Sequence, residues 1–190
     1  MYAQWLGPGS NSPPTDIDEF NKFVWNLASR YPQITYYELW NEPQLSQFWY
    51  PYDSGTLATL AQMGSRAYST IKSVNPGAIL LSASVLPRAS SGGMAKAQSY
   101  LDAIASAGWN IDAFATHIYP ENGMYTDTWY SMAQDVINSV AAMSPPTKEV
   151  WVTETTYNLL GDVIPEDQAV NYVNGTYNYA AALGIQQIYW

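Results

Sequence analysis

Short apolar segments alternate along the chain with longer segments whose apolar residues recur every three or four positions. The short segments predict buried strands, and the longer ones predict amphipathic helices. The expected strands cover residues 34–40, 78–84, 111–119, 149–154 and 185–190, after an aromatic strand remnant at residues 1–5. The expected helices cover residues 15–30, 56–74, 95–107, 129–140 and 165–184.

Strict alternation of strand and helix predicts right-handed βαβ units and a parallel sheet. Two architectures fit this order, an open doubly wound sheet and a (β/α)8 TIM barrel. A nucleotide-binding doubly wound sheet usually carries a glycine-rich phosphate-binding turn, and the chain contains neither G-x-G-x-x-G nor G-x-x-x-x-G-K-[ST]. We therefore expect an α/β TIM barrel.

The chain is short for a whole barrel, with 190 residues against the ~250 that a TIM barrel typically needs. We therefore predict one partial barrel domain over residues 1–190. It would run from the end of the third strand through the eighth, without the first two βα units and the last helix. An unclosed barrel exposes edge strands and its apolar interior, so we expect marginal stability, aggregation, pairing of two copies or a need for further residues.

The composition limits the classes of binding partner that we expect. The net charge is −9, and the seven Lys and Arg residues form no basic run, which disfavours nucleic acid and anionic membranes. No apolar run approaches the ~20 residues of a membrane helix, and the absence of cysteine excludes disulfides and thiolate sites. Eight Trp and sixteen Tyr are consistent with a stacking ligand, or simply with the packing of a large barrel.

Two of the expected strands end in a glutamate, Glu42 and Glu154, and a third ends in His117-Ile118-Tyr119. The triplet Asn41-Glu42-Pro43 is also typical of a simple turn. In a parallel barrel, however, the carboxyl ends of the strands meet on the face where catalytic groups collect. We therefore expect both glutamates, His117 and Tyr119 to converge there, with Trp190 at the end of the last strand.

Two carboxylates without a metal suit the cleavage of a glycosidic bond. One acid protonates the leaving oxygen, and the other attacks or stabilises the oxocarbenium-like carbon of the sugar. The environment of each carboxyl decides which of them holds a proton. We therefore expect a carbohydrate substrate, with no cofactor and no metal.

The ordered motifs Trp40-Asn41-Glu42-Pro43, His117-x-Tyr119, Thr153-Glu154 and the terminal Trp190 resemble those of retaining glycoside hydrolases of clan A. The similarity is to cellulase-like and β-xylosidase-like members. The resemblance implies that Glu42 is the general acid/base and Glu154 the nucleophile. It also implies roles for the residues around them: Asn41 would bond the sugar 2-hydroxyl, Tyr119 would orient Glu154, His117 and Trp40 would line the cleft, and Trp190 would stack under the sugar.

The chain also departs from this pattern, because many clan members place an Arg on the second strand and a His after the third. His117 is the only histidine here, and we assign it no proton transfer. Two other classes stay open, an inactive carbohydrate-binding module and an α/β domain whose acids are incidental. Secretion is expected only from the type of substrate, and the oligomeric state is not predicted. We expect Asp112 to be a solvated cap or turn, and Trp49 to flank the cleft or pack its loop.

Overall fold

The computed structural model describes residues 11–87, 93–120, 126–143, 147–156 and 164–190. The described helices are α1 (Ile17–Arg30), α2 (Ser54–Val74), α3 (Gly93–Ser106), α4 (Thr126–Met143) and α5 (Glu166–Ala182). The described strands are β1 (Tyr36–Glu38), β2 (Ile79–Leu81), β3 (Ala113–Ile118) and β4 (Glu149–Thr155). Every predicted helix is therefore present, and the remnant predicted at residues 1–5 lies outside the described residues.

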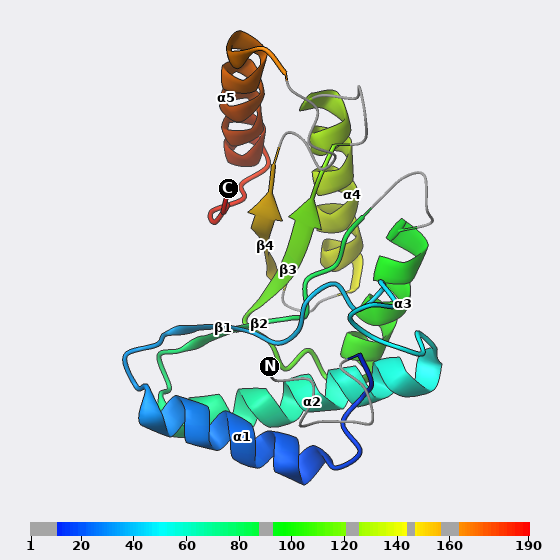
Figure 1. Ribbon diagram of the computed structural model, residues 1–190, viewed down its shortest axis with the longest axis vertical. Coiled ribbons are helices and arrows are strands. Elements are labelled where there is room, and N and C mark those ends of the chain that lie inside the picture. The colour runs from blue at the N-terminus through cyan, green and yellow to red at the C-terminus, as the bar shows by residue number, and fades with distance from the viewer. Residues whose placement is uncertain (1–10, 88–92, 121–125, 144–146, 157–163) are drawn as a thin grey trace.

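The strands form one parallel sheet in the order β1-β2-β3-β4, so neighbours in the chain are also neighbours in the sheet. The strand order does not reverse, as it would in a doubly wound sheet. Right-handed crossovers then place successive helices on one side of the sheet, as Figure 1 shows for α2, α3 and α4. The predicted α/β fold with a partial barrel is confirmed.

The two faces of the sheet pack differently. Phe114 and Val150 face the large apolar core that the sheet forms with α1 to α4. Ala113, Ala115 and Trp151 instead form a small cluster on the opposite face, which corresponds to the barrel interior. We call this opposite face the inner face. Side chains alternate along a strand, so His117 and Tyr119 continue the inner row that begins with Ala113.

The inner face is open at β1. Tyr36 is 56% exposed, although its ring contacts Trp151 with 5.7 Å between centroids. Tyr37, the next residue, turns to the other side and packs against the large core. This exposure agrees with an incomplete barrel, and the expected marginal stability stays a prediction.

The last predicted strand forms only in part. Residues 185–190 reach β4 through a single parallel bridge between Val152 and Ile188. The backbone N–H of Val152 donates to the Gln187 carbonyl over 3.0 Å, and the N–H of Tyr189 donates to the Val152 carbonyl over 2.9 Å. The segment therefore lies where the eighth strand was expected, but two ladder bonds are too few to make it a regular strand.

Two acidic side chains have structural roles in the fold. The first helix is capped by Asp16, whose Oδ1 accepts from the Asp18 N–H over 2.8 Å. Asp112 is no solvated turn residue, because its carboxylate pairs with Lys72 at 2.9 Å and accepts from the Leu80 N–H at 2.8 Å. It thus ties the last turn of α2 to the sheet. None of the described helices is long and apolar enough to span a membrane.

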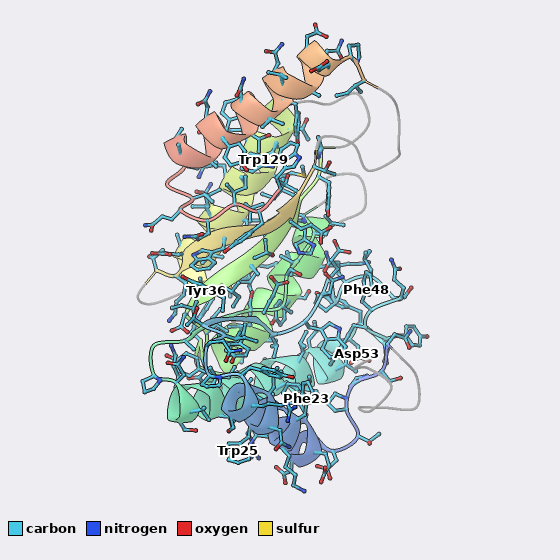
Figure 2. All side chains as sticks on the ribbon, turned by 60° about the vertical axis from the view of Figure 1, so that its left-hand side comes forward. Phe23, Trp25, Tyr36, Phe48, Asp53 and Trp129 are labelled. Atoms are coloured by element: carbon cyan, nitrogen blue, oxygen red, sulfur yellow. The ribbon has the colours of Figure 1, made fainter. Side chains whose placement is uncertain are left out.

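Trp129 of α4 anchors the second apolar core, between the sheet and α5 (Figure 2). Its side chain is fully buried, and its Nε1 donates to the Thr155 hydroxyl over 3.1 Å. We expect Trp129→Ala to lower the free energy of unfolding by about 3–5 kcal/mol, because the truncation leaves a cavity. Urea unfolding followed by circular dichroism measures this change.

Trp25 on α1 is the matched control for this substitution, because it is 54% exposed (Figure 2). Trp25→Ala should change the free energy of unfolding by less than about 0.5 kcal/mol. Equal losses for the two tryptophan variants would contradict the assigned core.

Candidate active site

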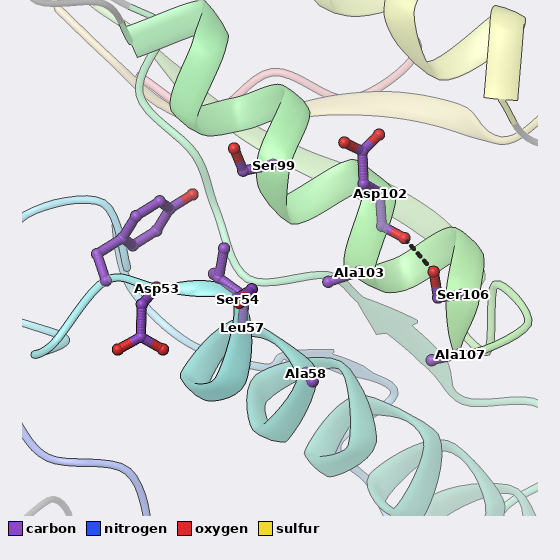
Figure 3. A pocket seen from close by; sticks show the side chains of 10 residues that line it. Asp53, Ser54, Leu57, Ala58, Ser99, Asp102, Ala103, Ser106 and Ala107 are labelled. Carbon is purple, nitrogen blue, oxygen red and sulfur yellow. Dashed lines mark hydrogen bonds between the residues drawn. The ribbon is translucent and has the colours of Figure 1, made fainter.

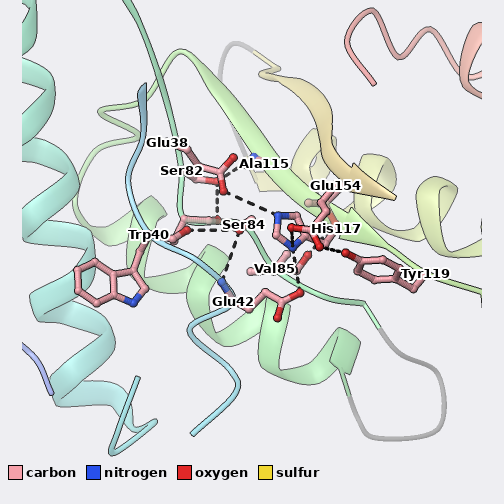
Figure 4. A network of polar contacts seen from close by, with 12 residues as sticks. Glu38, Trp40, Glu42, Ser82, Ser84, Val85, Ala115, His117, Tyr119 and Glu154 are labelled. Carbon is pink, nitrogen blue, oxygen red and sulfur yellow. Dashed lines mark hydrogen bonds and ion pairs between the residues drawn. The ribbon is translucent and has the colours of Figure 1, made fainter. Parts of the chain in front are cut away.

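The carboxyl ends of β1, β3 and β4 bring several polar side chains together on the inner face of the sheet (Figure 4). Glu42 follows β1, His117 lies in β3 with Tyr119 just after it, and Glu154 lies in β4. With Glu38 of β1 they form one polar group, which we call the carboxylate cluster. Residues far apart in the sequence meet here because parallel strands end at the same edge of a sheet.

Glu42 is held in an unusual backbone conformation. Its φ is 38°, in the left-handed region that residues other than glycine rarely adopt. Its backbone N–H approaches the Ser84 hydroxyl at 3.5 Å, and its side chain is largely buried. Such strain persists only where the surroundings impose it, and it is frequent at active sites. The turn after β1 therefore holds a largely buried carboxylate in a conformation that its neighbours must maintain.

His117 bridges the two predicted catalytic glutamates. Its Nδ1 lies 2.9 Å from Glu42 Oε1 and 3.8 Å from Glu154 Oε2, so these two oxygens are no more than about 6.7 Å apart. The imidazole is almost fully buried, whereas the Glu154 side chain is 56% exposed. A buried ring thus holds one carboxylate against the sheet and leaves the other accessible to a ligand.

A β-bulge turns Glu154 toward the inner face. Thr116 pairs with Val152 and His117 pairs with Glu154, so Thr153 is an extra residue in β4. Without this bulge, alternation would place Glu154 on the same side as Val152, which packs in the core under α5. A bulge re-aims the side chains that follow it. The irregularity in β4 therefore puts the second carboxylate in the cluster.

Tyr119 lies beside both His117 and Glu154. Its hydroxyl donates a hydrogen bond to Glu154 Oε1. Its ring meets the His117 ring edge to face, with 6.4 Å between centroids. Tyr119 thus holds one oxygen of Glu154, while the other oxygen faces the histidine.

Glu38 is a third carboxylate that the sequence analysis missed. Its Oε1 lies 3.9 Å from His117 Nε2, and it shares the inner face of β1 with Tyr36. Burial raises the pKa of the Glu38 carboxyl, while the Ser84 and Thr153 hydroxyls and His117 oppose the rise. The sequence signal for Glu38 is an acidic residue within an otherwise apolar strand. A carboxyl in such a strand needs polar neighbours when the strand is buried.

Asn41 and Trp40 lie next to Glu42 but differ in surroundings. Asn41 is exposed at the end of β1. The Trp40 ring packs edge to face on Trp49 with 5.5 Å between centroids, and its Nε1 donates to the Phe48 carbonyl over 2.9 Å. Trp49 is fully buried, so it packs the loop and does not flank a cleft. Trp40 therefore supports the loop after Glu42 through its ring.

Trp190, predicted as the sugar-stacking floor, packs against α5. Its ring lies 5.6 Å from the Tyr172 ring and 6.5 Å from the Tyr177 ring, measured between centroids. Ile188, two residues earlier, also packs on the helix side of the sheet. The period of two along an extended segment thus puts both side chains on the side opposite the carboxylate cluster.

A separate hollow of about 540 Å³ lies between α2 and α3 (Figure 3). Its two acids, Asp53 and Asp102, already have structural partners: Asp53 caps α2, and Asp102 accepts from Gln98 over 3.0 Å. None of the residues that line it belongs to the carboxylate cluster. Among the residues that the structure describes, no three acidic or histidine side chains are placed to hold a metal ion.

Comparison with known families identifies the chain. Residues 14–184 match the family model described as "Glycosyl hydrolase catalytic core". The chain belongs to this family. No curated protein sequence matches it. The predicted resemblance to clan A glycoside hydrolases is therefore confirmed at the level of family and fold.

Solved structures with this fold include enzymes that act on different glycans. A glucosidase from Croceicoccus marinus is 14% identical with a TM-score of 0.76, over 94% of this chain and 39% of its own. A fungal β-1,4-galactanase is 16% identical with a TM-score of 0.65, over 95% of this chain and 62% of its own. A Paenibacillus polymyxa xyloglucanase of glycoside hydrolase family 44 is 15% identical with a TM-score of 0.61, over 90% of this chain and 46% of its own.

These three solved enzymes share the fold of this chain, but the chain spans less than two thirds of each of them. At this identity the likeness concerns the fold alone. The roles of individual residues must come from the geometry of the carboxylate cluster.

Proposed function

We propose that this glycosyl hydrolase core cleaves β-glycosidic bonds with retention of configuration, using Glu42 as acid/base and Glu154 as nucleophile. The observation that carries the proposal is the His117 Nδ1 contact with both carboxylates, at 2.9 Å to Glu42 and 3.8 Å to Glu154. The two acids are thereby held on one face of the sheet, within reach of a single ring nitrogen.

The reaction would take two steps. Glu42 donates its proton to the glycosidic oxygen while a Glu154 oxygen attacks the anomeric carbon, which breaks the glycosidic bond and forms a glycosyl ester. Glu42 then takes a proton from water as the water oxygen attacks the same carbon, and Glu154 leaves as a carboxylate. The Tyr119 hydroxyl would stabilise Glu154 in its ionised form. Asn41, exposed beside Glu42, is placed to reach the sugar 2-hydroxyl.

The separation of the carboxylates supports retention over inversion. Retaining enzymes hold their two carboxyl groups about 5–5.5 Å apart, and inverting enzymes hold them about 6.5–9.5 Å apart. The oxygens of Glu42 and Glu154 that face His117 are at most about 6.7 Å apart. Little room is left between them for the extra water that inversion needs.

A neutral β-linked glycan fits the cluster best as substrate, because the cluster contains three carboxylates that would repel an anionic sugar. Galactan, xyloglucan and glucosides are acted on by the structural neighbours, according to their descriptions. The test is incubation with β-glucans, galactan, xyloglucan, xylan and aryl β-glycosides, followed by measurement of new reducing ends. Cleavage of at least one is expected, and no cleavage at any pH between 4 and 8 would contradict the proposal.

A carbohydrate-binding module without hydrolytic activity is the second candidate. It is favoured by the open inner face at Tyr36 and by the position of Trp190 against α5. Binding of a glycan in affinity electrophoresis without new reducing ends would support it. Under either function we expect the protein to act outside the cell, because polymeric glycans do not cross membranes.

A further inference from the structure

Three carboxylates surround the imidazole of His117. Glu42 and Glu154 face Nδ1, and Glu38 faces the other nitrogen, with 3.9 Å between Glu38 Oε1 and Nε2 (Figure 4). That distance is long for a hydrogen bond but within reach of an ion pair. Glu38, the last residue of β1, therefore lies across the ring from the proposed acid/base Glu42, which follows four residues later in the turn after the strand.

We propose that Glu38 is a positioning residue that controls the proton on His117, and through it the hydrogen bond to Glu42. This inference rests on the proposed acid/base role of Glu42. Glu38 is not a catalytic residue, because the His117 ring separates it from Glu42, the residue proposed to contact the sugar.

The acid/base must exist in two protonation states during a retaining reaction, and His117 can serve both. When Glu42 carries the proton, Nδ1 accepts it in a hydrogen bond, and the ring proton sits on Nε2 facing Glu38. When Glu42 is ionised after giving its proton to the glycosidic oxygen, the ring takes up a proton from solvent and donates from Nδ1, and the Glu38 carboxylate balances the charge at Nε2. Glu38 thus keeps the contact between His117 and Glu42 in both states.

The His117 ring is almost fully buried, so the carboxylates that face it dominate the electrostatic potential at its nitrogens. Four described groups face the ring: Glu38 of β1, Glu42 of the turn after β1, Glu154 of β4 and the Tyr119 ring just after β3. No Lys or Arg forms an ion pair with these three acids in the part of the chain that the structure describes. The loss of one carboxylate should therefore change the electrostatic potential at the His117 ring.

His117 is the only histidine in the chain, so its ring nitrogens can be followed by NMR without ambiguity. The experiment labels histidine with ¹⁵N and titrates the parent chain and the Glu38→Gln variant. We expect the ring of Glu38→Gln to lose its proton about one pH unit lower than the parent ring, since an opposite charge at this distance favours the charged form by that order. The amide keeps the shape of the side chain and removes only its charge.

Glu149→Gln is the matched control, because Glu149 lies at the other end of β4 and pairs with Ala113. Glu154 is five positions further along the strand, a distance of about 16 Å, which is beyond the Debye length at physiological salt. This variant should leave the titration of His117 unchanged. If Glu38→Gln does not fold, Glu38→Asp withdraws the carboxylate by one methylene and should give a smaller shift in the same direction.

An unchanged His117 titration in the folded Glu38 variant would overturn the proposal, and so would an equal shift in Glu149→Gln. The measurement needs no substrate. If the chain cleaves no glycoside but Glu38→Gln shifts the His117 titration, the proposed function is contradicted, and the proposed influence of Glu38 on His117 is supported.

Discussion

Replacement of Glu154 with Gln is expected to lower kcat for an aryl β-glycoside by roughly 10⁶-fold, the order that the loss of a serine nucleophile gives in a protease. An amide oxygen is too weak a nucleophile to form the glycosyl ester. The amide can still accept the Tyr119 hydrogen bond at Oε1, so the local structure should be kept. Release of the phenol, followed by absorbance, measures the loss.

Glu149→Gln provides the same chemical change in the same strand. Glu149 lies at the start of β4, where its Oε2 accepts from Trp151 Nε1 over 2.9 Å. This variant should keep the activity of the parent chain. Activity that survives in Glu154→Gln, or that is lost equally in both variants, would contradict the nucleophile assignment.

Replacement of Glu42 with Gln should have an effect that depends on the leaving group. For an alkyl or sugar leaving group, loss of the general acid should lower kcat/KM by about 10²–10⁴-fold. A dinitrophenyl β-glycoside needs no proton to leave, so its glycosylation step should be nearly unaffected. Rates on the two substrates, compared between the parent chain and Glu42→Gln, measure this dependence.

The Glu154→Gln variant supplies the control, because it should lose activity on both substrates alike. Equal losses on both substrates in Glu42→Gln would contradict a general acid role for Glu42. Such a result would instead point to a structural role for its buried contact with His117.

The helices could be predicted from the sequence because each carries a long apolar stripe, as α4 does from Trp129 to Val140. The strands were placed correctly but too long. Residues 34–40 and 78–84 were expected as full strands, whereas the β1–β2 ladder joins only Tyr36–Glu38 to Ile79–Leu81. Apolar content predicts that a segment is buried, but the extent of a ladder depends on the neighbouring strand.

In the carboxylate cluster, strand ends were sufficient to propose Glu42, Glu154, His117 and Tyr119. The bulge in β4 and the direction of Glu38 depend on how two strands pair, and the sequence of a single strand does not specify that pairing. The bulge at Thr153 exists only relative to β3, and the inward direction of Glu38 depends on which face of β1 is buried. Trp190 shows the same limit, because its side is set by the pairing of Ile188 with Val152.

The left-handed backbone at Glu42 was also beyond the sequence, since Asn41 or a glycine would be the expected residue at a positive φ. The contact with His117 holds the Glu42 side chain, and the Ser84 hydroxyl lies against the Glu42 backbone N–H, after the strand ends. The site thus departs from local preference where its chemistry is proposed, as functional sites often do.

The proposed retaining mechanism is tested most directly by the configuration of the sugar first released. Proton NMR of the anomeric region, recorded during the early minutes of hydrolysis of a β-glycoside that the chain cleaves, distinguishes the two anomers before they interconvert. The arrangement of Glu42 and Glu154 around His117 predicts that the β-anomer appears first and the α-anomer grows in later. Initial release of the α-anomer would show inversion and would contradict the assignment of Glu154 as nucleophile.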